Sequence, residues 1–431
     1  MGFDVKQILH GKARSLIHLE TGPGLGCTEP AAIGLATAAA ASLLPGGHVD
    51  SVHLSTDANI HKNAMGVVTP NSGGRASIPL AAAMGAVGGD PGQGLQVFAA
   101  VTQPKLAKAR RLVEEGRVAV DIAKDVPGLY VKAVVKAGDA EAVAVIRGQH
   151  DNIACLSLNG RELNDHPLLN PAHAAGAGEL PGLEKWLEGL GTPDLLDLLE
   201  DMDHEDLDYI RQGLRLNQDL AEYGLRHGPG LGVGRSQLSL MRQGALCKDM
   251  PLWGGIHAAA GIDARMGGVA LPAMTLAGSG NQGIAAGTPI AAAAEFATLE
   301  DETLVLKAVT LSYLITCLIK ARVGRLSALC GSAVAAGAGA AAGVAYLLGG
   351  TADKVGGAVT NHIENTAALI CDGAKTSCAL KVGEAAASGV KSALLALSGC
   401  VVRPIDGVAG RTGEESMANL GKLSREGLSN M

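Results

Sequence analysis

The segment from Leu326 to Ala352 contains no charged residue and consists mainly of alanine and glycine. It is long enough to span a bilayer, which needs ~20 apolar residues. Its strongly apolar side chains are few, and each favours insertion by only roughly 0.3–0.6 kcal/mol. The chain has 60 glycines and only 2% aromatic residues, so its helices must pack closely through small side chains. We therefore expect this segment to be a buried core helix in a protein that does not insert into a membrane.

The totals exclude several classes of protein. The chain has 431 residues, enough for two or three domains, and its 35 basic and 42 acidic residues give a net charge of −7. The absence of a basic stripe and the scarcity of aromatic side chains argue against nucleic acid as the main partner. The start, MGFDVKQILHGKARSL, lacks the apolar run of a signal peptide. Eight cysteines dispersed over this length do not form a disulfide scaffold, so we expect a cytoplasmic protein.

The order of patterns predicts an α+β fold, with a large Ala/Gly-rich, all-helical catalytic domain and a small inserted α+β domain. A basic amphipathic helix is expected at Pro104–Gly116, followed by three Val-rich strands, RVAVDIAKDV, YVKAVVKAG and AEAVAVIRGQ. The predicted boundaries are 1–96 for the first part of the helical domain, 97–166 for the inserted domain, 167–192 for a linker and 193–431 for the second helical part. The second part contains Cys330, Cys371 and Cys378, which are candidate metal ligands.

Cys371 and Cys378 lie seven residues apart around a Cys-Asp-Gly turn, and Cys330 lies upstream in the uncharged segment. Thiolates bind iron and zinc, and iron–sulfur clusters need several of them. The spacing is not CxxC, and spacing alone leaves open the commoner case of buried cysteines that act as small apolar residues. These three residues are candidate metal ligands.

Cys27 stands directly before Thr28, which we expect to cap a helix that continues through AAIGLATAAAASLL. A helix N-terminus favours a thiolate, so we expect a lowered pKa for Cys27. The residue could be a base, a nucleophile or a metal ligand. An incidental thiol at an ordinary helix start explains the local pattern equally well.

Two glycine-rich loops are candidate anion-binding sites. The loops Thr69–Gly74 and Gly278–Ile284 offer backbone N–H groups and short polar side chains, which can bind carboxylates or phosphates at helix starts. Neither matches the P-loop or dinucleotide motif, and ordinary turns remain an alternative. His150, after the third predicted strand, could reach an active site, although a surface histidine is the simpler interpretation.

In combination, these pieces resemble the L-cysteine desulfidase family, which is related to the iron–sulfur L-serine dehydratase α chain. The matching motifs cover nearly the whole chain: GCTEPAAIGLA, NIHKNAMGVVTP, HDNI, DARMGG, LPAM, GSGNQGI, RLSALC and ICDGAKTSCALKV. The resemblance implies a [4Fe–4S] cluster held by Cys330, Cys371 and Cys378, with one iron free for substrate. The family's further cysteine falls on Cys27, which thereby becomes the candidate catalytic base.

The resemblance also implies a small amino-acid substrate and β-elimination from L-cysteine to pyruvate, ammonia and hydrogen sulfide. The candidate substrate-binding residues are Lys62, Asn63, Thr69, Asn71, Ser72, Gly73, His150, Ser279 and Asn281. Two motifs depart from the family pattern, TPNSGGR in place of Pro-Gly-Thr-Gly and HDNI in place of HTNI. L-serine therefore stays open as the substrate. A protein that binds a cluster or an amino acid without turnover is the alternative from another class, and the close Ala/Gly helix faces suggest a homodimer.

Overall fold

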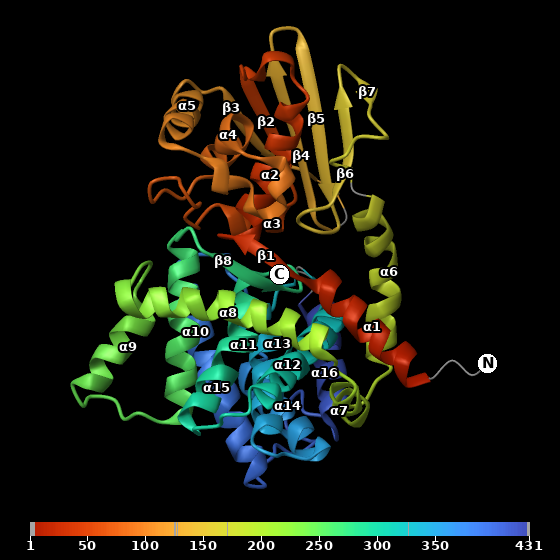
Figure 1. Ribbon diagram of the computed structural model, residues 1–431, viewed down its shortest axis with the longest axis vertical. Coiled ribbons are helices and arrows are strands. Elements are labelled where there is room, and N and C mark those ends of the chain that lie inside the picture. Colours follow the sequence, from red (N-terminus) through yellow and green to blue (C-terminus); the bar gives the residue numbers. More distant parts are fainter. Residues whose placement is uncertain (1–4, 125, 127, 170, 326, 429–431) are drawn as a thin grey trace.

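The computed structural model describes residues 5–124, 126, 128–169, 171–325 and 327–428. Figure 1 shows a small lobe built around a sheet, standing above a larger and mainly helical lobe. Each lobe has its own cluster of buried apolar residues. The chain is thus a mixed fold of helices and strands in which helices predominate, as the sequence predicts in outline.

The small lobe contains a mixed sheet with the strand order β3-β2-β4-β5-β6-β7. Strands β2 and β3 are parallel and the other neighbours are antiparallel. Its elements are α2 (Thr28–Ser42), η1 (Pro45–Gly47), β2 (Ser51–Thr56), α3 (Ala58–Ala64), α4 (Ile78–Gly88), η2 (Pro91–Ala100), α5 (Gln103–Glu114), β3 (Val118–Ile122), β4 (Tyr130–Ala137), β5 (Ala140–Arg147), β6 (Ile153–Leu158) and β7 (Arg161–Glu162).

Alternation along the central strands determines which face of this sheet is covered. In β4, Val131, Ala133 and Val135 are fully buried, whereas the residues between them are more exposed. Successive side chains of a strand point to opposite faces, so these three point together toward the helices of the lobe. Helix α2 packs on β4 and β5 and also on α4. The polar start of α3 and the β5–β6 turn are thereby held at the lower edge of the lobe.

The sheet extends beyond the predicted range 97–166. Strand β2, at Ser51–Thr56, lies between β3 and β4, and residues of α2 and α4 share the buried cluster of this lobe. A boundary at residue 96 therefore cuts through the small lobe. Sequence order alone could not reveal this, because β2 is a single short strand and is separated from its partner strands by α3, α4, η2 and α5.

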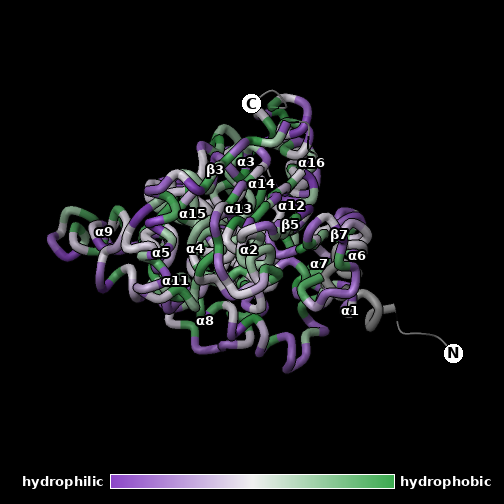
Figure 2. Tube along the Cα trace, turned by 90° about the horizontal axis from the view of Figure 1, so that it is seen from above, coloured by the Kyte–Doolittle hydropathy of each residue, from purple (hydrophilic) through white to green (hydrophobic). Residues whose placement is uncertain are grey.

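The helical lobe contains the remaining elements. They are α1 (Val5–Glu20), β1 (Thr21–Leu25), α6 (Pro171–Glu188), α7 (Thr192–Glu200), α8 (His204–His227), α9 (Val233–Arg242), α10 (Met250–Met266), β8 (Pro272–Leu276), α11 (Gly280–Phe296), α12 (Glu302–Val323), α13 (Gly331–Leu347), α14 (Ala352–Thr366), α15 (Cys378–Leu397), α16 (Gly413–Lys422) and η3 (Leu423–Gly427). Figures 1 and 2 both show α9 projecting from the edge of the body.

The all-helical prediction for this lobe is wrong in one respect, because β1 and β8 form a two-stranded antiparallel ribbon. The ribbon lies where the two lobes meet (Figure 1). The predicted linker 167–192 is also largely helical, since it contains α6, which has Pro181 inside it. The glycine-rich stretch 278–287 is not a loop for most of its length, because α11 begins at Gly280.

Helix α13 lies within the uncharged Ala/Gly segment 326–352 and at the centre of the helical lobe. Its residues are almost all buried, and it packs against α11, α12, α14 and α15. A Cβ placed on Gly339 would lie 2.3 Å from the Oγ1 of Thr316 and 2.5 Å from the backbone oxygen of Ser312. The helices thus approach as closely as glycine permits, which confirms the expected buried core helix. Leu326, the first residue of the predicted segment, lies outside the described residues.

Gly339→Ala is expected to destabilise the protein, because the new methyl group meets backbone of α12 that cannot move independently. The expected loss is about 1–3 kcal/mol or more, the usual range for overpacking. The matched control is Gly11→Ala on the exposed face of α1, where a Cβ would meet no atom within 4 Å. That change should instead stabilise by about 0.5–1 kcal/mol. Urea unfolding midpoints of the two variants should move in opposite directions, and equal midpoints would contradict the packing described.

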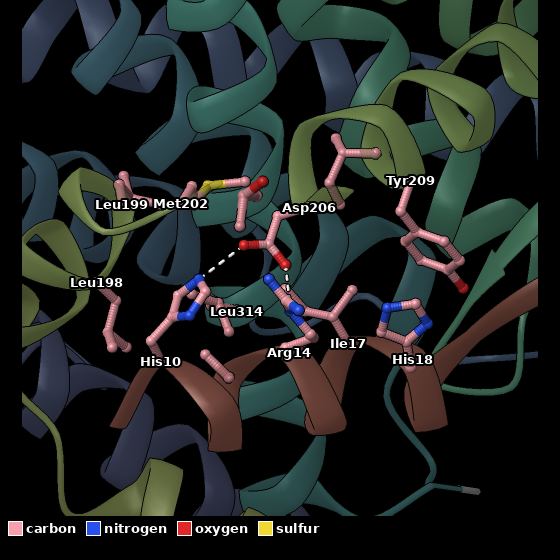
Figure 3. Close-up of a pocket in the computed structure, with 13 residues that line it drawn as sticks. His10, Arg14, Ile17, His18, Leu198, Leu199, Met202, Asp206, Tyr209 and Leu314 are labelled. Carbon is pink, nitrogen blue, oxygen red and sulfur yellow. Dashed lines mark hydrogen bonds and ion pairs between the residues drawn. The ribbon is translucent and has the colours of Figure 1, made fainter. Parts of the chain in front are cut away.

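Helix α1 is anchored to the lobe by an ion-pair cluster (Figure 3). The Nε2 atom of His10 lies 2.7 Å from Oδ2 of Asp206, and Arg14 Nε donates to Oδ1 of the same carboxylate at 2.7 Å. The pocket beneath is lined mainly by apolar side chains such as Leu198, Met202 and Leu314. Because the carboxylate of Asp206, which is only partly buried, is already paired, we interpret this pocket as the docking surface of α1.

Within the described residues, α12 is the one helix that is long and apolar enough to cross a membrane. Of its most apolar window, 83% is buried inside the fold. A core helix passes the same test of length and composition.

Candidate active site

A cavity with an empty volume of about 860 Å³, measured out to its mouth, lies between the two lobes. The small lobe contributes the start of α2, helix α3 and the β5–β6 turn, and the helical lobe contributes the rest of the wall. Cys27, Ser279 and Cys330 are the residues that precede α2, α11 and α13, and Cys378 is the first residue of α15. Four helix N-termini therefore meet at this cavity, and such ends favour negative charge.

Three of the cysteines are brought together by a short backbone ladder. Leu329 and Ile370 form an antiparallel bridge, flanked by hydrogen bonds from Cys330 N to Leu369 O at 2.8 Å and from Cys371 N to Ala328 O at 2.7 Å. Cys378 follows on the turn that opens α15, and all three line the cavity. This bridge and the turn before α15 thus bring Cys330 together with Cys371 and Cys378 in one cavity.

The three thiols are close enough to influence one another. Burial raises the pKa of Cys330 to about 11, and the charges of Cys371 and Cys378 add to that rise. Burial likewise raises the pKa of Cys378, and Cys371 contributes to the rise. A bound metal supplies the positive charge that Cys330 and Cys378 need in order to become thiolates beside Cys371.

The three cysteines of the cavity are not arranged as the ligands of a single metal ion. Among the described residues, no group of three or more His, Cys, Asp or Glu could hold one metal ion. A cluster spreads its cysteine ligands over several irons, so its ligands stand farther apart than those of one ion. The wall also carries Arg265, Lys320 and Arg325 against the single carboxylate of Glu29. That positive excess suits an anionic cluster and an anionic substrate.

Cys27 is not the acidic thiol that the sequence suggests. Burial raises its pKa well above the ordinary value, and the charge of Glu29 raises it further. Its Sγ donates to Glu29 Oε2 at 2.8 Å, while Asn63 Nδ2 donates to Glu29 Oε1 at 2.9 Å. The expectation of a lowered pKa is therefore wrong, because burial and a neighbouring carboxylate outweigh the helix N-terminus. Cys27 itself takes the capping position that the sequence assigned to Thr28, without a side-chain cap.

Glu29 is a charged residue of this site that the sequence analysis missed. It is 8% exposed, and burial alone raises its pKa. The positive charges of His150 and Arg265 and the hydrogen bond from Cys27 reverse that effect, so the pKa of Glu29 is lowered overall. The only sequence feature that could have indicated Glu29 is its position inside the GCTEP motif. An acidic residue in the first turn of a helix is common, so the motif alone does not indicate a site.

His150 lines the cavity from the β5–β6 turn, and its part in substrate binding stays a prediction. It is 8% exposed, and its Nε2 has no hydrogen-bond partner among the described residues. Burial lowers the pKa of His150, although the charge of Glu29 opposes this change. The lowered pKa favours the neutral imidazole, which can accept a proton.

Arg265 is the second functional residue that sequence reasoning missed. Its side chain is 2% exposed, and its Nη1 donates to Oδ1 of Asn281 at 2.8 Å. Its Nε and Nη2 have no partner among the described residues. A buried guanidinium with unpaired donors is costly, so it indicates a site for a carboxylate. The residue stands in the DARMGG motif, but nothing local shows that it points into a cavity.

The other predicted residues divide into two groups. Lys62 and Ser279 line the cavity, and the Nζ of Lys62 donates to the backbone oxygen of Cys371 at 3.3 Å. The loop residues Thr69, Asn71, Ser72 and Gly73 are not among the described residues that line it. Their hydrogen bonds serve the small lobe, from Asn71 Nδ2 to Phe98 O at 2.9 Å and from Ser72 Oγ to Arg75 O at 2.8 Å. The predicted role of this loop in substrate binding therefore has no support in the geometry.

The two lobes thus enclose a cavity for a small molecule, and its wall contains three cysteines and a buried arginine. The chain belongs to the serine dehydratase alpha chain family, because the model of that family matches residues 93–431. It is 44% identical to a UPF0597 protein of Desulfatibacillum aliphaticivorans over 99% of this chain and 96% of the relative. A UPF0597 protein of Desulfotalea psychrophila is also 44% identical, with 99% and 96% covered, and one of Clostridioides difficile is 35% identical, with 96% of each covered. The predicted relationship is thus confirmed.

Proposed function

We propose that the chain is an iron–sulfur-dependent lyase that removes the β-substituent of L-cysteine and yields pyruvate, ammonia and hydrogen sulfide. The observation that carries the proposal is the meeting of three cysteines and a buried, half-paired arginine in one cavity. L-serine is the second candidate substrate, favoured by the family to which the chain belongs. Because all eight cysteines are free, we also propose a reducing, cytoplasmic location.

Cys330, Cys371 and Cys378 would hold a [4Fe–4S] cluster. When bound, the cluster supplies a Lewis-acidic iron that weakens the bond to the departing sulfur or oxygen. The backbone bridge at Leu329 and Ile370 keeps two of these ligands in register. Burial lowers the pKa of Lys320 to about 8, and the charges of Cys371 and Cys330 oppose that change, which places this cation within reach of both residues.

The remaining residues orient the substrate and move its proton. Arg265, held by Asn281, would bind the α-carboxylate through its unpaired nitrogens. Cys27 is the proposed base for the α-proton, and because its thiol is protonated at rest, it must lose that proton before it can act. Cleavage of the bond at the β-carbon then releases the substituent with one proton. The aminoacrylate that remains tautomerises and is hydrolysed to pyruvate and ammonia.

Anaerobic reconstitution with iron and sulfide, followed by pyruvate assays on L-cysteine and L-serine in parallel, tests the proposal. Pyruvate with equimolar sulfide from L-cysteine supports it, and pyruvate from L-serine alone moves the assignment to the second candidate. Cys27→Ala should retain the iron content and lose roughly 10²–10⁴-fold in kcat, as expected for a lost acid–base group. A reconstituted protein that yields no pyruvate from either amino acid contradicts the proposal and favours a binding protein.

A further inference from the structure

A second, larger cavity adjoins the proposed active site. This outer chamber has an empty volume of about 1190 Å³, measured out to its open side. Its walls come from the end of α1 and the start of β1, from η2 and from the β5–β6 turn, and they include the side chains of Gln93, Gln96, Gln149 and Thr275. The lining is rich in amide and hydroxyl groups, which suits a small polar ligand.

A partition only one layer of side chains thick separates the two cavities. His150, Gly278 and Arg325 line both of them. A Cβ placed on Gly278, whose φ is +80°, would lie 3.2 Å from His150 Nδ1 and 3.7 Å from Arg325 Nη1. The two side chains therefore close over a glycine, and any ligand in the outer chamber lies next to the active site.

The outer chamber also holds an ion pair between the half-buried Arg325 and the buried Glu20, and each partner retains spare atoms. Arg325 Nη2 donates to Glu20 Oε1 at 2.7 Å. Glu20 is 4% exposed, and its Oε2 accepts no hydrogen bond from the described residues. Burial raises the pKa of the neighbouring Glu184. Arg325, which lies 3.9 Å from Oε1 of Glu184, opposes the rise, and the charge of Glu20 and a hydrogen bond between the two carboxyl groups add to it, so the two acids share one site. Glu20 thus offers an oxygen to a cation, and the Nη1 of Arg325, which lies at the partition, offers a donor to an anion.

We propose that the outer chamber binds the zwitterion of a small α-amino acid before it passes the partition into the active site. The ammonium would bind Glu20 Oε2 and the carboxylate would bind the Nη1 of Arg325. Movement of the flexible Arg325 side chain then opens the way past Gly278. The inference rests on the proposed function, because it takes the substrate to be an amino acid.

Binding in the outer chamber can be measured without turnover. Gln93→Trp places an indole at the edge of the chamber, while the two native tryptophans, Trp186 and Trp253, are not among the described residues that line it. Titration of the cluster-free Gln93→Trp protein with L-serine should give a saturable change in fluorescence. Adding Glu20→Gln should weaken the apparent affinity by roughly tenfold or more, because a charged hydrogen bond is lost. The matched control, Glu114→Gln on the exposed face of α5, should leave it unchanged.

Passage through the chamber is tested by filling it in the reconstituted protein. Gln96→Trp should lower kcat/KM by roughly tenfold or more while kcat changes less than about twofold, because access and not chemistry is impaired. The matched control, Arg111→Trp on the exposed surface of α5, should behave like the natural protein. A flat titration of Gln93→Trp, or a normal kcat/KM in a folded Gln96→Trp protein, overturns the inference. Saturable binding in a protein without lyase activity would support the chamber and contradict only the proposed function.

Discussion

Cys330→Ser is expected to abolish the lyase activity by removing a ligand of the cluster. Changes in the shell behind a metal ligand already cost roughly 10- to 100-fold in affinity or activity, so loss of the ligand itself should cost at least the upper value. The backbone hydrogen bond from Cys330 N to Leu369 O does not involve the thiol, so the fold should persist. Iron and acid-labile sulfide per chain, measured after anaerobic reconstitution, should fall together with the activity.

The control for this substitution is Cys400→Ser, which changes an exposed thiol that is not among the described residues lining the cavity. It should retain the iron content and activity of the natural protein. Full retention of iron and turnover by Cys330→Ser would show that the cysteine is a buried apolar residue and no ligand, the interpretation that spacing alone leaves open.

Arg265→Met is expected to lose most of kcat/KM while the protein remains stable. Truncating one partner of a buried, hydrogen-bonded charge pair costs ~2–5 kcal/mol of binding energy, which is roughly 30-fold to several thousand-fold in kcat/KM. In the free protein, Nε and Nη2 of Arg265 have no partner among the described residues. Replacement by an apolar side chain of similar length removes that cost, so the unfolding free energy should be unchanged or higher.

Arg265→Lys keeps a charge but loses the planar fork, so its kcat/KM should lie between those of the natural protein and Arg265→Met. Arg111→Met on the exposed surface of α5 is the matched control and should change nothing. Iron content must be measured in each variant, because a loss of iron would place Arg265 with the cluster and not with the substrate. A normal kcat/KM in Arg265→Met would exclude the proposed carboxylate site.

Local patterns predicted what depends on local structure. The Val-rich alternation predicted β3, β4 and β5, and the predicted cap at Thr28 placed the start of α2 within one residue of its actual cap, Cys27. The three metal-ligand candidates and His150 do line one cavity, although only motif resemblance connected residues so far apart in the chain. The high Ala, Gly and Pro content of residues 167–192 predicts a linker, whereas most of this range forms helix α6. The helical periodicity of its apolar residues is too weak to predict that helix.

Properties that depend on burial could not be predicted from local patterns. The pKa of Cys27 is raised by burial and by Glu29, and neither effect is visible in the GCTEP motif. Arg265 lies in a helix whose other residues are mostly small and apolar, and the direction of its side chain follows from how α10 packs against α11. The loop at Thr69–Gly73 has the composition of an anion site, yet its polar groups bond to Phe98, Arg75 and Arg110.

The central claim is that an amino acid binds beside a cluster held by three cysteines, and Mössbauer spectroscopy of protein reconstituted with ⁵⁷Fe tests it most directly. The account predicts a four-iron cluster in which one iron site changes its spectrum when L-cysteine or L-serine is added. The same change should be absent or greatly weakened in Arg265→Met, which lacks the carboxylate site. A protein that retains no cluster, or a cluster whose four irons are indifferent to both amino acids, would contradict the account.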